Sequence, residues 1–551
     1  AGTTHKTSLK CDRTSPITGR LERMATSGNF VQLHNHTHYS LLGRGVKDSG
    51  SGQARQRTQH AAVGITDHGN MHGAYEMWST AVKEGVKPII GIEAYVTPET
   101  ARQDQTRVSW DTNWNPDIDP QHRRRNPNDV SGGGLITHLT MWAETDEGLV
   151  NLMKASTDAN LEGRVMRYPR MDKEILAKYS KGIIASSGCP SGIIQTRLLL
   201  GQFDEALRAA GELQDIFGRD NFYIEFMDHG LKIEKQVTDG LLDIAKKLNA
   251  PLLATNDSHY VRAEDAGSQD AMLCINSGST LDEPGRFKFD GTGYYLKSAE
   301  EMRELFKDIP EACDNTLEIA ERCNVMFDDH EDGAFMPQFD CPEGWDETSL
   351  FLKKVEEGLE RRYDGHPPIE VLKQADYECG VICQMQFCGY FLVVADYINW
   401  AKSHGVMVGP GRGSAAGAMV AYAMGITELD PIKHGLIFER FLNPERVSLP
   451  DIDVDFDPDG RGRVLDYVGD KYGRDKVAQC VIYGTIKTKQ ALKDSARIMG
   501  YEFSMGERIT KALPPAQTGG KDIPLHDIFE PSSKRYAEAR EFRELYDSIR
   551  M

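Results

Sequence analysis

The chain has 551 residues and a mass of 61.5 kDa, a length that predicts several domains rather than one. Its 64 basic and 83 acidic residues give a net charge of −19, which excludes a positive field over the whole chain as a means of attracting nucleic acid. No apolar run approaches the roughly 18 residues that a transmembrane helix needs, so we expect no membrane association. Ten scattered cysteines without a CxxC pair indicate a reducing compartment, the cytoplasm.

The elements expected along the chain begin with a polar extension over 1–27, which lacks the apolar stretch of a secretory signal and is expected to be disordered. From 28 to 315, β-rich runs alternate with helical patterns, which is typical of α/β folds. The runs are FVQLH, AAVGITDH, KPIIGIEAYV, GLITHLTMWAE, GIIASSG, NFYIEFM and PLLATNDSHYV. A long polar loop is expected over 100–134, and helical patterns dominate from about 316 to 399.

Histidines and acidic residues lie at the ends of these β-rich runs. In VQLHNHTHYS, His34 and His36 are two residues apart, so on a strand they point to one face, which suits two imidazoles on one metal cluster. Asp257 and His259 repeat the spacing in ATNDSHYV. Other runs place further candidates at comparable positions, namely His68, Glu93, His138 and Cys189. A lone strand histidine is more often structural, but this ensemble predicts a multinuclear hydrolase site for zinc, manganese or iron.

These segments resemble the metal-site segments of PHP (polymerase and histidinol phosphatase) domains, through HNHTHYS, GITDHG, KPIIGIEAYV, HLT, GCPSG and TNDSHYV. The resemblance implies a PHP domain over 28–315 with a distorted (β/α)7-type barrel, a trinuclear metal centre and 3′-5′ exonuclease activity. The ligands that it implies are His34, His36, His68, Glu93, His138, Cys189, Asp257 and His259. The family pattern has an aspartate where this chain has Gly43, so a structural PHP domain that binds metal weakly is an open alternative.

A glycine-rich run precedes an acidic run. In GPGRGSAAG, glycine lets backbone N–H groups converge on an anion, and Arg412 adds a bidentate donor. Downstream, PDIDVDFD alternates Asp451, Asp453 and Asp455 with apolar residues, so on a strand the carboxylates share one face. A pair of Mg²⁺ ions would relieve their repulsion and support nucleotidyl transfer. The alternatives are a solvated acidic strand edge or a calcium loop.

The second half of the chain closely resembles C-family bacterial replicative DNA polymerases, through GPGRGSAAG, LDPIKHGLIFERFLNPER, PDIDVDFD and YGTIKTKQALKDSAR. The resemblance implies a first palm segment over 316–482, similar to the nucleotidyltransferase fold of beta-type polymerases, and an incomplete helical thumb over 483–551. It implies that Asp451 and Asp453 are catalytic and bind Mg²⁺. It further implies nucleotide contacts from Arg412, Gly413, Ser414, Arg440 and Arg446.

A basic stripe is expected in the thumb. Lys489, Lys493 and Arg497 are spaced four apart in KTKQALKDSAR, so a helix would present them on one face. The spacing is compatible with a solvated face or with DNA backbone contacts, and the resemblance favours DNA. The implied substrates are primer-template DNA and deoxynucleoside triphosphates (dNTPs).

Members of this polymerase family continue past the thumb with a third catalytic aspartate, fingers and a region that binds the sliding clamp and other replisome subunits. We therefore expect this chain alone to polymerise poorly. The leading hypothesis is the amino-terminal portion of a DNA-directed DNA polymerase that extends a primer 3′ end by two-metal nucleotidyl transfer. One alternative is a PHP metal-dependent 3′-5′ exonuclease or phosphoesterase. Another is a non-catalytic DNA-binding subunit of the replisome.

Overall fold

The computed structural model describes residues 30–40, 62–110, 128–129, 134–327, 338–443, 450–480, 482–515 and 523–549. The chain divides into two compact units. The first comprises Ala1–Phe327 together with Thr485–Met551, and the second comprises Asp328–Gly484. Each unit has its own hydrophobic core.

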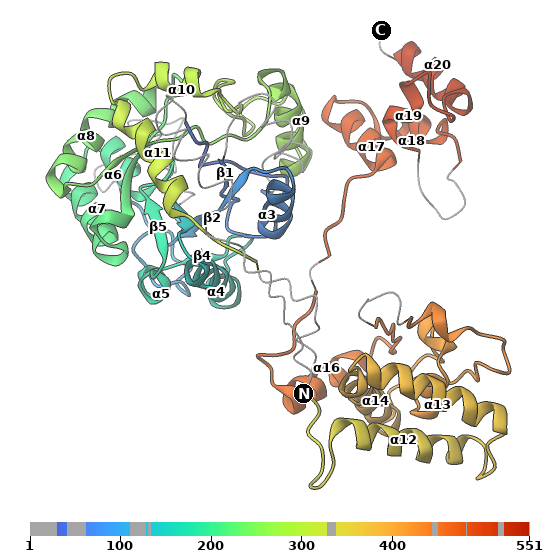
Figure 1. The fold of residues 1–551 in the computed structure, drawn as a ribbon. Coiled ribbons are helices and arrows are strands. Elements are labelled where there is room, and N and C mark those ends of the chain that lie inside the picture. Colours follow the sequence, from blue (N-terminus) through green and yellow to red (C-terminus); the bar gives the residue numbers. More distant parts are fainter. Residues whose placement is uncertain are drawn as a thin grey trace. The chain divides into compact units, whose positions relative to one another are not determined.

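The first unit is built on a seven-stranded sheet that curls and has helices packed around it (Figure 1). The strands are β1 (Ala62–Ile65), β2 (Lys87–Val96), β3 (Thr137–Ala143), β4 (Arg170–Met171), β5 (Ile183–Ser186), β6 (Phe222–Phe226) and β7 (Leu252–Ala254). Their order is β1-β2-β3-β5-β6-β7, with β4 paired to β2, and β3 is antiparallel to both of its neighbours. Six of the predicted β-rich runs form β1, β2, β3, β5, β6 and β7; FVQLH forms no regular strand, and β4 lies outside the predicted runs.

The FVQLH segment links the two edges of the curled sheet instead of forming a regular strand. On one side, the Gly64 amide donates to the Gln32 carbonyl at 2.7 Å, next to β1. On the other side, the His36 amide donates to the Ser258 carbonyl at 2.9 Å, just after β7. The carboxyl ends of the parallel strands β1, β2, β5, β6 and β7 and the amino end of the antiparallel β3 lie at the same end of the sheet, which this segment borders.

Helices cover the sheet of the first unit. They are α3 (Ala74–Lys83), α4 (Asp146–Glu162), α5 (Lys173–Tyr179), α6 (Ile193–Leu199), α7 (Phe203–Phe217), α8 (Lys232–Leu248), α9 (Ala266–Ser277), α10 (Ala299–Leu305) and α11 (Pro310–Arg322). Side-chain caps set some helix starts: the Thr145 side chain accepts from the Gly148 amide at the start of α4. Helix α11 crosses the predicted boundary at 315, and the compact unit continues to Phe327 because Ile319 is fully buried in its core.

The second unit is mainly helical, as the sequence predicts. Its helices are α12 (Glu347–Arg362), α13 (Ile369–Gln384), α14 (Cys388–Ser403), α15 (Met419–Ala423) and α16 (Arg461–Tyr472). Phe351, Phe391 and Phe438 are fully buried in its core. The helical pattern that begins at Ser414 forms a short 3₁₀ turn, Ser414–Gly417, before α15. Within the described ranges, no single helix can span a membrane, although α13 and α14 together, bent by 114°, meet the length and composition criteria.

The carboxyl-terminal helices α17 (Thr488–Ile498), α18 (Phe503–Lys511), α19 (Leu525–Phe529) and α20 (Arg540–Ile549) surround a small core that includes Ile528 and Phe542. They belong to the first unit because α17 packs against α9. The Leu281 amide donates to the Ile498 carbonyl at 2.8 Å. The functional labels PHP, palm and thumb for these regions stay predictions at this point.

Candidate metal centre and acidic segment

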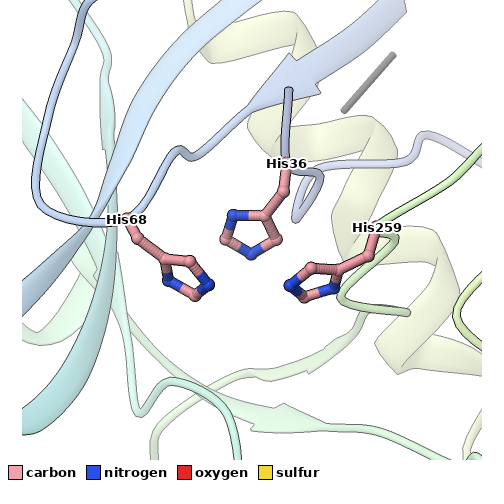
Figure 2. Close-up of side chains that lie close together, drawn as sticks. All are labelled: His36, His68 and His259. Atoms are coloured by element: carbon pink, nitrogen blue, oxygen red, sulfur yellow. The ribbon is translucent and has the colours of Figure 1, made fainter. Parts of the chain in front are cut away.

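Donor side chains from several segments of the first unit converge at one end of the sheet, where the parallel strands end and the antiparallel β3, which carries His138, begins. Within each of three groups, the potential ligand atoms lie within 4.8 Å of one another. The groups are His36, His68 and His259; His34, His36, Glu93 and Asp257; and His68, Glu93 and His138. Figure 2 shows the rings of His36, His68 and His259 turned toward a shared space. The spacing is that of a metal-binding cluster.

The outer ring nitrogens of two of these histidines are held by hydrogen bonds. His34 Nδ1 lies 2.8 Å from Glu225 Oε1, and His259 Nδ1 lies 2.8 Å from the Asp257 carbonyl oxygen. Because a carbonyl oxygen and a carboxylate accept, each Nδ1 is the protonated nitrogen. The buried Nε2 atoms of both histidines have no hydrogen-bond partner among the described residues. Both Nε2 atoms thus lie in the cluster, where a cation would bind them.

His36 is oriented by a hydroxyl and a buried carboxylate. Its Nδ1 lies 3.0 Å from Ser40 Oγ, and that hydroxyl donates to Asp67 Oδ1 at 2.6 Å. Asp67 also accepts from the Thr37 amide at 2.7 Å, which ties the His34–His36 segment to the end of β1. Burial raises the pKa of Asp67 despite these donors. On the inner side, His36 Nε2 lies 2.9 Å from Asp257 Oδ1.

Glu93 is the electrostatic centre of the cluster. Its carboxylate oxygens lie 2.5 Å from His68 Nδ1 and 2.9 Å from His138 Nδ1. Burial raises the pKa of Glu93, but the charges of His138 and His68 outweigh it and hold the pKa well below its usual range. Burial lowers the pKa of His259 to about 4 and that of His36 well below its usual value. At neutral pH these two imidazoles are therefore neutral, the form that binds a metal.

The donor set fits a divalent metal, because it combines the neutral imidazoles of His36 and His259 with ionised carboxylates and buried atoms without partners. The side chains of His68, Asp257 and His138 are 11, 13 and 16% exposed, whereas His34, His36 and Glu93 are fully buried. The cluster therefore opens to solvent beside His68, Asp257 and His138.

The predicted ligand Cys189 is not part of the three groups found in the described ranges, although its Sγ lies 3.3 Å from His138 Nδ1. Burial and the negative charge of Glu93 raise its pKa well above the usual value, so in the metal-free protein it is a thiol. Gly43, where the family pattern expects an aspartate, lies outside the described residues.

The acidic segment of the second unit shows the predicted alternation. Asp451, Asp453 and Asp455 are exposed, while Ile452 and Val454 pack against the core. The carboxylates thus share a solvent-facing side, as expected for extended backbone.

The strand predicted for this segment is nevertheless reduced to an isolated antiparallel bridge between Val408 and Phe456. The partner segment turns away at Gly411, whose φ of 108° is outside the range of an ordinary strand residue.

The glycine-rich loop approaches these carboxylates closely. The Arg412 guanidinium lies 3.3 Å from Asp453 Oδ1 and 3.3 Å from Asp455 Oδ1. A Cβ atom on Gly413 would lie 3.2 Å from Asp453 Oδ2, so glycine permits the approach. Ser414 and Arg440 are also exposed in this unit, and Arg446 lies outside the described residues.

Comparison with known proteins places these two sites in one family. The model of the PHP domain matches residues 32–229, and the model described as the bacterial DNA polymerase III alpha NTPase domain matches residues 349–550. A DNA polymerase III subunit alpha from Mycobacterium tuberculosis (strain CDC 1551 / Oshkosh) is 52% identical over 527 residues, which cover 95% of this chain and 44% of the relative. The Thermus aquaticus subunit is 38% identical over 574 residues, which cover 94% of this chain and 45% of the relative.

The chain is similar to DNA polymerase III alpha subunits over nearly its whole length. It matches the amino-terminal portion of that subunit and spans less than half the length of these relatives. The alpha-subunit resemblance inferred from GPGRGSAAG and PDIDVDFD is confirmed, as is the PHP resemblance of the amino-terminal half.

Within this alpha-subunit portion, the predicted basic stripe lies on α17, but two of its members have protein partners. Lys493 pairs with Glu507 on α18. The Arg497 guanidinium donates to the Ile275 carbonyl at the end of α9, at 3.3 Å. Lys489 is exposed. Arg497 therefore helps to hold α17 against α9, and Lys493 helps to hold α17 against α18. DNA contact by the stripe stays a prediction.

Glu225 and Ser40, which help to orient the ligands, were not predicted from the sequence. Glu225, Ser40 and Asp67 do not contact the shared space of the cluster, yet they hold the buried histidines. Glu225 carried a usable signal, because it is an acid within the apolar run FYIEF, where an unpaired charge is costly.

Proposed function

We propose that this chain supplies the amino-terminal part of a DNA-directed DNA polymerase, including a first palm segment with a nucleotidyltransferase-like fold. The observation that carries the proposal is the row of exposed acids, Asp451, Asp453 and Asp455, beside the glycine-rich loop. Asp451 and Asp453 would hold Mg²⁺, which activates a primer hydroxyl and neutralises charge on the transferred phosphoryl group.

The chain's own residues then bind the incoming dNTP. Arg412 is half-exposed beside the acids and can direct its planar guanidinium at phosphate oxygens. Gly413, with φ of 68°, and Ser414 give a triphosphate close access to the backbone. Arg440 and Arg446 are additional candidates for phosphate contact.

Titration of a fluorescent dNTP into the chain with Mg²⁺ tests this proposal. The substitution Arg412→Ala removes a charge-assisted phosphate contact and is expected to weaken binding about 10- to 100-fold. Asp453→Asn is expected to remove the Mg²⁺ dependence of binding. Lys373→Ala, a loss of an exposed positive charge on α13, is the matched control. Equal affinities for wild type, Arg412→Ala and Asp453→Asn would refute the nucleotide site.

The buried cluster favours a second function, in which the PHP domain hydrolyses a phosphodiester at a DNA 3′ end with the help of metal ions. For this domain we infer a distorted seven-stranded barrel. His34, His36, His68, Glu93, His138, Cys189, Asp257 and His259 would hold zinc, manganese or iron. Such ions lower the pKa of a bound water and polarise a phosphoryl oxygen. Glu225 and the Ser40–Asp67 pair would keep the imidazoles in the ligand tautomer.

An end-labelled primer-template with a mispaired 3′ end tests the second function. With Mn²⁺, the wild-type chain is expected to shorten the primer, and EDTA or His36→Ala is expected to abolish shortening. His366→Ala, at an exposed histidine of the second unit, serves as the control. Shortening that persists in His36→Ala would assign the activity elsewhere.

The proposed substrates of the whole alpha subunit are primer-template DNA and dNTPs, with Lys489, Lys493 and Arg497 of a helical thumb beside the DNA backbone. A sliding clamp and other replisome subunits are proposed partners, and the proposed location is the cytoplasm.

A further inference from the structure

An exposed aromatic pair borders the metal cluster. Phe287 is 55% exposed, and its ring centroid lies 6.2 Å from that of Phe289. The Phe289 ring lies 4.7 Å from the ring of His259, a member of the cluster, and 4.8 Å from the ring of Tyr294. The aromatic rings therefore form a line from the cluster to solvent, and Lys288 between the two phenylalanines is exposed.

The segment that carries these rings is anchored. Arg286 donates from both terminal guanidinium nitrogens to the two carboxylate oxygens of Asp270 on α9, at 2.6 Å each. Its Nε also donates to the Leu281 carbonyl at 3.0 Å. Because this bidentate pair is mostly shielded from solvent, Phe287 is presented on a fixed backbone, which lowers the entropy cost of binding a flat ligand.

The position of the pair determines what it can bind. The cluster opens to solvent beside Asp257, two residues from His259, and the Phe289 ring lies against that histidine. Successive aromatic faces next to a lysine are the features that bind unstacked bases and a phosphate backbone. A paired duplex end keeps its bases stacked and offers no free base face to these rings.

We propose that Phe287 and Phe289 are substrate-binding residues that stack the bases of a single-stranded 3′ end and direct its last phosphodiester toward the metal cluster. Lys288 contacts the backbone of the same strand. This inference rests on the proposed phosphoesterase function, because it assigns the substrate form that reaches that centre.

The first test measures stacking without turnover. A single-stranded oligonucleotide carries 2-aminopurine near its 3′ end and a terminal phosphorothioate linkage that resists hydrolysis, and it is titrated with the full chain and Mn²⁺. Stacking is expected to quench the 2-aminopurine fluorescence. Phe287→Ala is expected to weaken binding about 5- to 100-fold and to reduce the quench, whereas Phe287→Trp retains both. Leu161→Ala, at a 78% exposed apolar side chain of α4, is the control.

Equal affinity and quench for Phe287→Ala and wild type would overturn the proposal, as would a wild-type complex without any quench. The second test compares hydrolysis of frayed and fully paired 3′ ends. In Phe287→Ala, KM for the frayed end is expected to rise more than kcat falls, and Phe287→Trp restores it. A wild-type chain that quenches but hydrolyses neither end would refute the phosphoesterase function and leave the stacking site in place.

Discussion

Glu225 is the residue whose side chain orients the fully buried His34. It lies in β6 and is 1% exposed. Besides the bond to His34 Nδ1, its carboxylate accepts from the Ser186 and Thr255 hydroxyls at 2.5 Å each. Three hydrogen bonds thus join the carboxylate to the histidine and the neighbouring strands, and they compensate a charge that would otherwise be costly to bury.

The substitution Glu225→Gln is expected to lower metal affinity about 10- to 100-fold, because an amide can present its NH₂ to His34 and permit the wrong tautomer. Competition with a chromogenic chelator measures the affinity. Glu205→Gln, at an exposed position of α7, is the matched control. Unchanged affinity in Glu225→Gln would show that His34 does not depend on this carboxylate.

For single residues, the sequence predicts which side chains can bind metal but not which neighbouring groups orient them. The spacing of His34 and His36 and of Asp257 and His259 is local, so it can be read directly. The partner of His34 is 191 residues away, and no local pattern specifies that contact.

At the level of secondary-structure elements, α13 and α15 are joined by a hydrogen bond to a buried carboxyl group. Glu378 on α13 is fully buried and accepts from the Val420 amide in the first turn of α15 and from the Gln374 side chain, at 2.9 Å each. Burial raises the pKa of Glu378 to about 7, and the two donors only partly oppose this rise. Helix α15 follows the glycine-rich loop, so this contact also supports the proposed nucleotide site.

The stability of the second unit is therefore expected to depend on pH. The folded pKa of Glu378 lies above its unfolded value near 4.5, so the folded state binds more protons between these values. Its contribution to the free energy of unfolding is largest below about pH 4.5 and is lost as the pH rises through about 7, a change of about 3 kcal/mol.

Urea unfolding at pH 5 and pH 8, followed by protease protection of peptides from α12 to α14, measures this change. In Glu378→Gln, the free energy of unfolding is expected to vary less with pH, because the titrating carboxyl group is gone. Glu370→Gln, at an exposed position of the same helix, is expected to show the wild-type pH dependence. The same slope in both variants would contradict the assignment to Glu378.

Prediction from the sequence works best for elements with a strong local pattern. The alternation of acidic and apolar residues in PDIDVDFD predicts that Asp451 and Asp453 are exposed, as the structure shows. It does not give the pairing of that segment, because pairing depends on where Val408 and Gly411 direct the partner backbone. The extended FVQLH segment was predicted as a strand, yet its hydrogen bonds are too few for one.

On the scale of the whole molecule, the metal centre unites segments from residue 34 to residue 259 in the first unit. The carboxyl-terminal helices join this unit through α17 and α9. No sequence pattern predicts this last contact, because its hydrogen bonds involve backbone carbonyls of residues more than two hundred positions apart in the chain.

Metal binding is expected to stabilise the first unit selectively, since a ligand that binds only the folded state adds free energy to unfolding. Hydrogen exchange with Mn²⁺ or with EDTA measures this effect for each segment. Added metal should slow exchange in β2 and β3, which carry Glu93 and His138, and leave α12 and α14 of the second unit unchanged at low metal concentration. Equal slowing in both units would contradict a cluster confined to the first.

The central claim is that the buried histidines and acids form a metal centre, and metal content per chain tests it most directly. The wild-type chain, purified without chelators and loaded with Zn²⁺, Mn²⁺ or Fe²⁺, is passed over a desalting column and analysed by mass spectrometry for metals. The account predicts that at least one ion per chain is retained by wild type and Glu205→Gln and lost from His36→Ala and Glu93→Gln. Equal metal content in all four proteins, or none in wild type, would contradict it.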